Sequence, residues 1–144
     1  MIETRTWTKA DIPKIAELEK RCFADAWSET ELDGCLSLPV YKTFLLEDGS
    51  NIIGYACLLT VYEDAEILNI AVAPEFRKRG YGLSLMRKML TVAKQSGAQS
   101  VFLEVRENNE PAKNLYRSLG FEEYGLRKNY YPDGENAILM TKRI

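Results

Sequence analysis

The spacing of apolar residues changes several times along the chain, and each change predicts a new element of secondary structure. Residues 2–7 alternate between apolar and polar types, as in a first strand. Thr8 then begins a T-x-x-D sequence, and apolar residues at helical spacing follow as far as Cys22, which predicts a helix. The sequence SETE at 28–31 is a capping box and predicts a second, short helix through Leu36.

The middle of the chain is typical of consecutive strands. Apolar, aromatic-rich segments at 41–47 and 51–61 are joined by DGS at 48–50, which predicts a hairpin. A second turn is expected at residues 63–65, followed by a third strand at 66–72.

The remaining half returns to alternating helices and strands. Residues 80–97 and 111–120 have helical patterns that end at glycine, and 100–105 is an apolar strand between them. Two last strands surround a Pro-Asp-Gly turn at 132–134. The order β-α-α-β-β-β-α-β-α-β-β predicts an α/β fold with a mixed, mostly antiparallel sheet flanked by helices. No linker or repeat divides residues 1–144, so we expect one domain.

Composition narrows the classes of function. An apolar fraction of 46% and a charged fraction of 28% are those of a folded globular protein. A general nucleic-acid binder is basic, so the net charge of -2 argues against a nucleic-acid partner. No apolar signal region or membrane-length run is present, so we expect a cytoplasmic protein without a membrane partner. The oligomeric state stays open.

The missing histidines and the few cysteines limit the chemistry. Because the chain has no histidine, Ser-His and Cys-His catalysis and His-based metal sites are excluded, and acid–base chemistry falls to other side chains. Cys22, Cys35 and Cys57 are odd in number and lack C-x-x-C spacing, which indicates packing residues rather than disulfides or a zinc site. We therefore expect no metal.

A basic, glycine-containing loop precedes the helix predicted at 80–97. Arg77, Lys78 and Arg79 stand immediately before Gly80 and Gly82, although helix N-termini favour negative charge. Backbone N–H groups at a glycine-rich helix start form a ring of donors suited to phosphate, which predicts a phosphorylated ligand. The alternative is a solvated basic turn whose glycines serve geometry alone.

This loop carries a resemblance to a known family. Val72-Ala73-Pro74 followed by R-K-R-G-Y-G at 77–82 resembles the acetyl-CoA signature of the GNAT acetyltransferase superfamily, and the predicted element order is similar to that of the family. The resemblance implies acetyl-CoA as co-substrate, with its pyrophosphate on the loop amides and its pantetheine arm along the preceding strand. The implied cofactor-binding residues are Ile70, Ala71, Val72, Arg77, Lys78, Arg79, Gly80, Tyr81, Gly82 and Asn109.

Later segments resemble the N-terminal protein acetyltransferases of the bacterial RimI type. The matching runs are LEVR at 103–106, AKNLYRSLGF at 112–121 and RKNYYP at 127–132. The resemblance implies that the acceptor is the N-terminal peptide of a ribosomal small-subunit protein, with alanine first. One departure is Asp25-Ala26, where the family commonly has Phe-Pro, and it concerns the acceptor rather than the acetyl-CoA site.

Two residues are candidates for acid–base catalysis. Alternation in the strand at 100–105 puts Glu104 with Phe102 on one face, where loss of water would make the carboxylate a better proton acceptor; the alternative is an ion pair with Arg106 or another cation. Tyr116 is either an aromatic core residue or a proton donor. The resemblance implies that Glu104 accepts a proton and that Tyr116 protonates the leaving thiolate.

Further candidates concern the acceptor and the cofactor. Asn109 can contact the pantetheine arm, cap the helix that follows, or do both. Tyr130 and Tyr131 either line a peptide groove or pack as strand aromatics, and Glu63 either attracts a cationic peptide or belongs to a solvated turn. Two other functions stay open beside a peptide N-acetyltransferase: a small-molecule amine N-acetyltransferase and a non-catalytic acyl-CoA-binding module.

Overall fold

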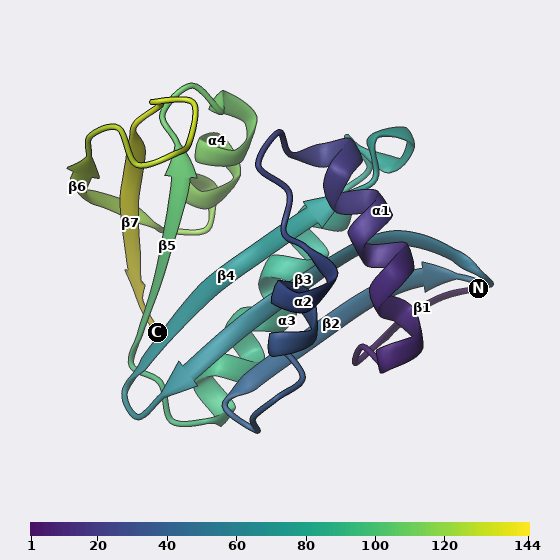
Figure 1. Ribbon diagram of the computed structural model, residues 1–144. Helices are drawn as coiled ribbons and strands as arrows, with labels where there is room; N and C mark the ends of the chain where they lie inside the picture. Colours follow the sequence, from purple (N-terminus) through teal and green to yellow (C-terminus); the bar gives the residue numbers. More distant parts are fainter.

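The centre of the computed structural model, which covers residues 1–144, is a seven-stranded sheet with the strand order β1-β2-β3-β4-β5-β7-β6 (Figure 1). Neighbouring strands are antiparallel except β4 and β5, which are parallel. The predicted fold class and element order are confirmed. The strands are β1 (Ile2–Arg5), β2 (Tyr41–Asp48), β3 (Asn51–Val61), β4 (Asp64–Val72), β5 (Ser100–Arg106), β6 (Glu122–Arg127) and β7 (Ala137–Arg143). The helices are α1 (Ile12–Cys22), α2 (Glu29–Gly34), α3 (Tyr81–Gln95) and α4 (Glu110–Ser118), with short 3₁₀ helices at Lys9–Asp11 and Pro74–Phe76.

The parallel strands β4 and β5 separate soon after they meet. Their pairing runs only from Asp64↔Ser100 to Glu66↔Phe102, and beyond it the two strands diverge, as Figure 1 shows. A register shift opposite β3 adds a bulge at Leu68, which has no partner there. The later part of β4 therefore has a neighbour on one side only, and its main chain is open on the side facing β5.

Helices cover both faces of the sheet. In Figure 1, α1 and α2 lie in front of the sheet and α3 lies behind it. The face behind packs Met86 and Met89 of α3 and Tyr116 of α4 against alternate residues of β5, such as Leu103. As predicted from the alternation, Glu104 lies on the opposite face, where it is half-buried.

The predicted helix starts and the hairpin are confirmed. Ser28 and Glu31 form the capping box, with the Glu31 N–H donating to Ser28 Oγ and the Ser28 N–H donating to Glu31 Oε1, each at 3.1 Å. Thr8 donates its N–H to the Asp11 carboxylate at 2.7 Å. Residues 41–48 and 51–61 form the hairpin.

Two predicted boundaries are wrong. The turn expected at 63–65 is shorter, because Ala65 is buried and pairs within β4, and the chain reverses at Tyr62 and Glu63 instead. The first strand ends at Arg5 rather than at residue 7. Trp7 leaves the strand direction because its indole donates to the Phe44 carbonyl at 2.8 Å inside the core.

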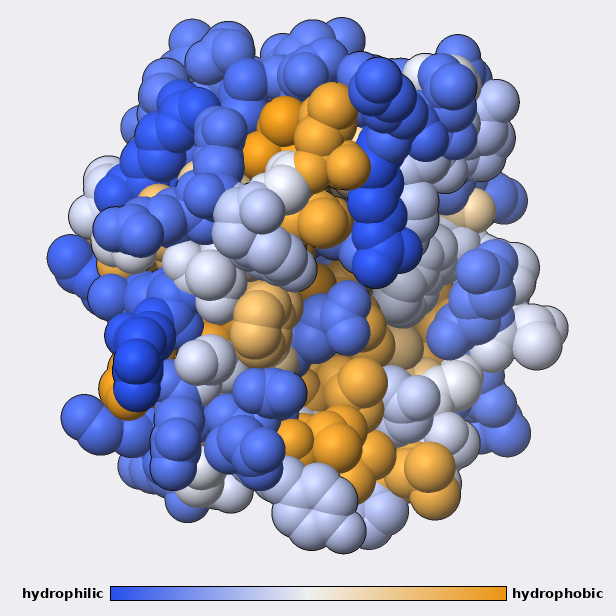
Figure 2. All heavy atoms as spheres, turned by 90° about the vertical axis from the view of Figure 1, so that its left-hand side faces the viewer, coloured by the Kyte–Doolittle hydropathy of each residue, from blue (hydrophilic) through white to orange (hydrophobic).

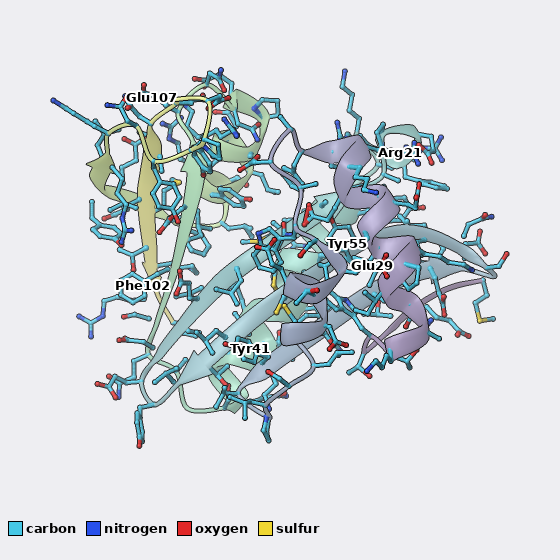
Figure 3. All side chains as sticks on the ribbon, viewed as in Figure 1. Arg21, Glu29, Tyr41, Tyr55, Phe102 and Glu107 are labelled. Carbon is cyan, nitrogen blue, oxygen red and sulfur yellow. The ribbon has the colours of Figure 1, made fainter.

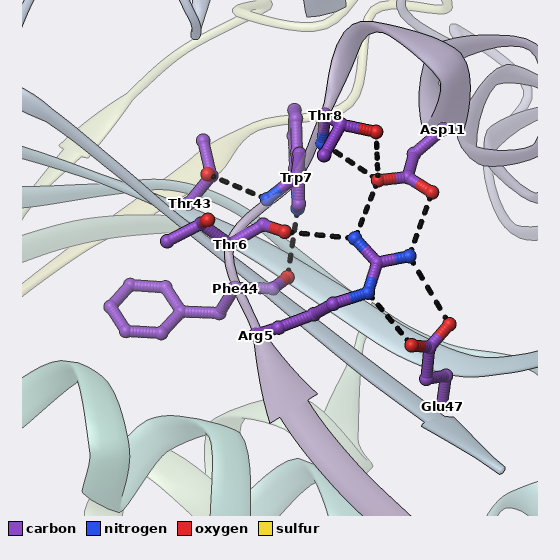
Figure 4. A network of polar contacts seen from close by, with 8 residues as sticks. All are labelled: Arg5, Thr6, Trp7, Thr8, Asp11, Thr43, Phe44 and Glu47. Carbon is purple, nitrogen blue, oxygen red and sulfur yellow. Dashed lines mark hydrogen bonds and ion pairs between the residues drawn. The ribbon is translucent and has the colours of Figure 1, made fainter.

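A polar network closes the end of the sheet where β1 leads into α1 (Figure 4). The Arg5 guanidinium bonds the Asp11 carboxylate at 2.7 and 2.9 Å and the Glu47 carboxylate at 2.7 and 3.2 Å. Arg5 holds the pKa of Asp11 well below its ordinary range. Every carboxylate in this network has a cation and hydrogen-bond donors.

The outer surface is mixed in character. Figure 2 looks at the side that carries β6 and β7, where apolar patches interrupt a hydrophilic surface. Tyr124 and Leu126 of β6 are among the exposed apolar side chains. None of the helices has the length and apolarity needed to cross a membrane.

Candidate active site

The loop between β4 and α3 presents unpaired backbone donors. Lys78 and Gly80 have φ values of 64° and 85°, and Gly80 is the N-cap of α3. The first bond of this helix runs from the Ser84 N–H to the Gly80 carbonyl, so the N–H groups of 78–83 have no protein acceptor. A concave row of free amides at a helix N-terminus is suited to a phosphate group.

The three cations of this loop have different surroundings. The Arg77 guanidinium donates to the Val72 carbonyl at 3.0 Å and to Cys22 Sγ at 3.4 Å, which ties the loop to the end of β4. Arg79 lies over the Phe76 ring at 5.7 Å, whereas the Lys78 side chain is exposed. All three keep positive charge beside the free amides, and their contact with a diphosphate stays a prediction.

The two glycine positions of the loop differ in why they suit glycine. Gly80 requires glycine for its positive φ. A Cβ at Gly82 would lie 3.5 Å from Leu115 and 3.9 Å from Val72, which is ordinary contact, so the protein alone does not demand glycine there. The free space at Gly82 lies between the end of β4 and α4, beside the open edge of β4. The main chain of Ile70 to Val72 lies along this edge.

A cleft of about 320 Å³ adjoins this edge where β4 and β5 separate. It is lined from α1, the α1–α2 connection, β4, β5, α4 and the β6–β7 connection. Five of the residues predicted for the site line it: Ile70, Glu104, Asn109, Tyr116 and Tyr131. The structure thus brings both acid–base candidates into one cleft, although they come from different elements.

Glu104 has a single, long ion pair. Its nearest basic partner is Arg127 at 3.9 Å, and its side chain keeps 21% of its surface exposed. Of the ion pairs that the sequence left open, the one with Arg106 is absent, because Arg106 bonds Asp25, Asp133 and Glu135, whereas a long one with Arg127 is present. The Glu104 carboxylate is therefore available to accept a proton in the cleft.

Tyr116 is buried but not sealed. Only 7% of the residue is exposed, and burial raises the pKa of its phenol to about 12. Its ring packs edge-on against Phe121 at a centroid distance of 6.1 Å. The hydroxyl has no hydrogen-bond partner in the protein, but its oxygen is not completely covered. Because Tyr116 lines the cleft, this oxygen opens onto it. At neutral pH it carries a proton that it can donate.

Three of the other candidates lie at the cleft or its margin. Tyr131 lines the cleft beneath Arg106, whose guanidinium is 4.1 Å from the ring centroid. Tyr130 is 46% exposed, and interaction of its hydroxyl with Glu104 raises its pKa. Asn109 caps α4 by accepting from the Ala112 N–H at 3.2 Å, and it also lines the cleft.

Glu63 does not join this group. It sits in the β3–β4 turn, where its carbonyl accepts from the N–H groups of Gln99 and Ser100, and it lines neither the cleft nor the second hollow beside it. The solvated-turn interpretation of Glu63 describes its position.

A second hollow, also of about 320 Å³, lies on the other side of Glu104 and was not predicted. Phe102, Tyr124 and Glu66 line it, and Glu104 is shared with the cleft. Burial and the Glu104 charge raise the pKa of Glu66. The signal in the sequence was Glu66, a second carboxylate on a strand next to that of Glu104.

The cleft also contains residues that the sequence alone did not single out. Arg106 joins Asp25 of the α1–α2 connection to Glu135 of the β6–β7 connection, so one guanidinium ties together the two segments that flank the cleft. Glu19 and Asn69 lie on the α1 side of the same cleft. These groupings join residues far apart in the chain.

Comparison with known proteins identifies the group to which these features belong. The model of the acetyltransferase (GNAT) family matches residues 12–121. The [ribosomal protein bS18]-alanine N-acetyltransferase of Haemophilus influenzae is 36% identical over 135 residues, which are 91% of this chain and 91% of that protein.

Solved structures agree with the family match. The crystal structure of the ribosomal-protein-S18-alanine N-acetyltransferase from Escherichia coli superposes with a TM-score of 0.92 at 33% identity, covering 100% of this chain and 94% of that one. Arabidopsis thaliana NAA60, solved in complex with acetyl-CoA, has a TM-score of 0.90 at 17% identity, covering 100% and 99% of the two chains, and shares the fold.

Proposed function

Because the chain belongs to the GNAT family of acetyltransferases and is an acetyl-CoA-dependent N-acetyltransferase, we propose that its acceptor is the N-terminal amine of a ribosomal small-subunit protein that begins with alanine. The proposal is supported by relatives of that activity whose similarity extends over nine-tenths of both chains. An acceptor of this kind implies that the enzyme works in the cytoplasm.

The residues around β4 and α3 fit acetyl-CoA as the co-substrate. The free N–H groups of Gly80, Tyr81 and Gly82 would hold its pyrophosphate, and Lys78 and Arg79 would add charge. The open main chain of Ile70 to Val72, apart from the Val72 carbonyl that Arg77 occupies, would pair with the amides of its pantetheine arm, and Asn109 lies beside the same path. Acetyl-CoA supplies the thioester, and the chain supplies its orientation.

Glu104 is the proposed proton acceptor. A peptide α-amino group has a pKa of about 8, so most of it is protonated at neutral pH and cannot attack a carbonyl. Glu104 takes this proton, either directly or through a water molecule, and the amine nitrogen then forms its bond to the acetyl carbon.

Tyr116 is the proposed proton donor. As the new C–N bond forms, the bond between the acetyl carbon and sulfur breaks, and the sulfur leaves with negative charge. Tyr116 gives its phenolic proton to this sulfur. The nitrogen of the new amide releases its surplus proton to solvent in the cleft, and Tyr116 regains a proton from the same solvent. Its pKa of about 12 keeps the donor loaded before the reaction.

The observation that supports this mechanism is that Glu104 and Tyr116 line the same cleft. A carboxylate from β5 and a phenol from α4 face one cleft, at the place where the main chain of β4 is open. A module that only binds acyl-CoA would not require an acid and a base at the same place.

The test offers the protein acetyl-CoA and a peptide with an N-terminal alanine, followed by mass spectrometry of the product. We expect one acetyl group on the α-amine and none on the same peptide with a blocked N-terminus. Preferential acetylation of spermidine or an aminoglycoside would instead support a small-molecule acceptor.

A variant pair tests the role of Tyr116. Tyr116→Phe should lower kcat roughly 10- to 100-fold and leave acetyl-CoA affinity within a few-fold, because only the donated proton is lost. Tyr62→Phe, at an 88% exposed turn position, is the matched control and should turn over normally. Equal rates for both variants would exclude Tyr116 as the donor.

A further inference from the structure

Glu19 of α1 is buried without a cation. The residue is 1% exposed, and its carboxylate accepts a hydrogen bond from Asn69 Nδ2. Burial, with smaller contributions from the charges of Asp25 and Glu31, raises the pKa of Glu19 to about 7. Removing a carboxylate from water without a compensating charge is unfavourable, so this position invites a functional explanation.

The groups packed around Glu19 are neutral or acidic. From α1 and the segment after it come Cys22 and Asp25, and from α2 come Glu31 and Cys35. Tyr55 of β3 is fully buried below α1 (Figure 3), and burial and the Glu19 charge raise its pKa. The nearest cations bond other members of the group, Arg77 to Cys22 and Arg106 to Asp25, and no lysine or arginine bonds Glu19 itself.

Asn69 connects Glu19 to the cleft. Its residue follows the bulge of β4, and both Asn69 and Glu19 line the cleft that contains Glu104. Its Nδ2 faces Glu19. Its Oδ1 accepts no hydrogen bond and is not completely covered by other atoms. The oxygen side of the carboxamide is therefore open to the cleft.

The charge on Glu19 decides which way this carboxamide points. An ionised carboxylate only accepts hydrogen bonds, so it holds the NH₂ group of Asn69 and leaves the oxygen toward the cleft. A neutral carboxylic acid both donates and accepts, so it tolerates either orientation. In the reversed orientation, Asn69 would present donors to the cleft and repel the N–H groups of an amine.

We propose that Glu19 is a positioning residue: as a carboxylate it fixes the Asn69 carboxamide so that Oδ1 accepts a hydrogen bond from the acceptor amine. This inference rests on the proposed function, since it assumes an amine acceptor in the cleft. It adds an acceptor-binding group to the site on the side opposite Glu104 and Tyr116.

The first experiment measures the KM for the alanine peptide between pH 6 and pH 9 in the wild type, Glu19→Gln and Glu17→Gln. Glutamine resembles the neutral acid, because it too can donate and accept. We expect Glu19→Gln to raise this KM roughly tenfold at pH 8.5, about the effect of one hydrogen bond, and less than about twofold at pH 6. The KM for acetyl-CoA should not change.

Glu17 is exposed on the same helix, so Glu17→Gln controls for the loss of a charge. A merely structural role for Glu19 would give a ratio of KM values that is constant with pH, and that result would overturn the inference. Asn69→Ala, which keeps Glu19, should raise the peptide KM at every pH. In the double variant the two effects should not add.

The second experiment does not require turnover. In the NMR spectrum, the side-chain NH₂ resonances of Asn69 should shift with a midpoint near pH 7 in the wild type and stay constant in Glu19→Gln. Asn69 resonances that ignore Glu19 would overturn the inference even in an active enzyme. Lack of peptide acetylation by the wild type would instead defeat the proposed function and leave the NMR result interpretable.

Discussion

Two buried carboxylates at opposite ends of α1 are held in opposite ways. Asp11, immediately before the helix, has a side chain that is 12% exposed and bonds the Arg5 guanidinium and the N–H and hydroxyl of Thr8. Glu19, two turns later, is more deeply buried, and it interacts with neutral groups, the Asn69 carboxamide and the Tyr55 hydroxyl. Arg5 lowers the pKa of Asp11, whereas burial raises that of Glu19 to about 7.

This difference separates an acid held in an ion-pair network from two acids that line the cleft. Asp11 joins β1, β2 and α1 through one arginine, and its charge is fully compensated. Glu19 and Glu104 lack such a partner, the latter being 3.9 Å from Arg127 at its closest. Acids in a cleft without a close, fully paired cation are candidates for acid–base chemistry.

The largest effect on the reaction is expected for Glu104, the proposed proton acceptor. Glu104→Gln should lower kcat/KM for the alanine peptide roughly 100- to 1,000-fold, because a glutamine cannot accept the proton of the amine. Steady-state kinetics measures it, and the melting temperature should stay near that of the wild type. Glu107→Gln, at an exposed position just beyond β5, is the control. Comparable rates in the two variants would remove Glu104 from the mechanism.

The next effect is one of stability without activity. Asp11→Asn should lower the free energy of unfolding by about 2 kcal/mol, because Arg5 loses one of its two carboxylate partners and Thr8 loses a charged acceptor. Urea unfolding measures this loss, and acetyl transfer below the unfolding temperature should be unchanged. A large loss of turnover in the folded variant would contradict the division between the two regions.

A smaller effect distinguishes the two acids by pH. The folded-state pKa of Glu19 is raised from 4.5 to about 7, so between these values the folded protein binds a proton that the unfolded chain does not. Stability from this group is therefore present below about pH 4.5 and is lost as pH rises through 7, by about 1 kcal/mol or more. Glu19→Gln should remove this dependence in chemical unfolding curves.

Asp11 should behave with the opposite sign. Its folded-state pKa is depressed below 3.8, so its contribution to stability is present above that value and is lost as pH falls below it. Acid unfolding of the wild type should therefore be steeper than that of Asp11→Asn. Identical acid limbs for the two proteins would show that the Arg5 network does not govern acid stability.

The smallest effect is expected for an ion pair on the surface. Arg21 and Glu75 form a salt bridge, but half of each side chain is exposed. Water and salt screen such a pair, so Glu75→Gln should not measurably change the melting temperature or the peptide KM. Differential scanning calorimetry at two salt concentrations checks this, and a clear destabilisation at low salt only would mean that the pair contributes.

Local signals predicted much of the fold. The capping box at Ser28, the hairpin at residues 41–61 and the glycines that end α3 and α4 depend on neighbouring residues, and these predictions are confirmed. The turn at 63–65 was misplaced because pairing of Ala65 with both neighbouring strands outweighs the local preference of Glu-Asp for a turn.

The candidate site was predictable only where one segment carries it. The loop at 77–82 and the alternation that exposes Glu104 can be read from consecutive residues. Glu19, Asn69 and Arg106 acquire their significance from partners 27 to 81 positions away, such as Asp25 for Arg106. A helical pattern at 12–22 indicates that Glu19 faces inward, but it does not show which side chains surround the carboxylate.

The early separation of β4 and β5 has a consequence for how the two parts of the sheet are held together. Only three residue pairs connect β4 to β5. An extended ligand bound along the open edge of β4 would take the place of the missing strand neighbour. The co-substrate would then complete the architecture that uses it. Binding of the co-substrate would thus extend the sheet into the opening between β4 and β5, where acetyl transfer is proposed.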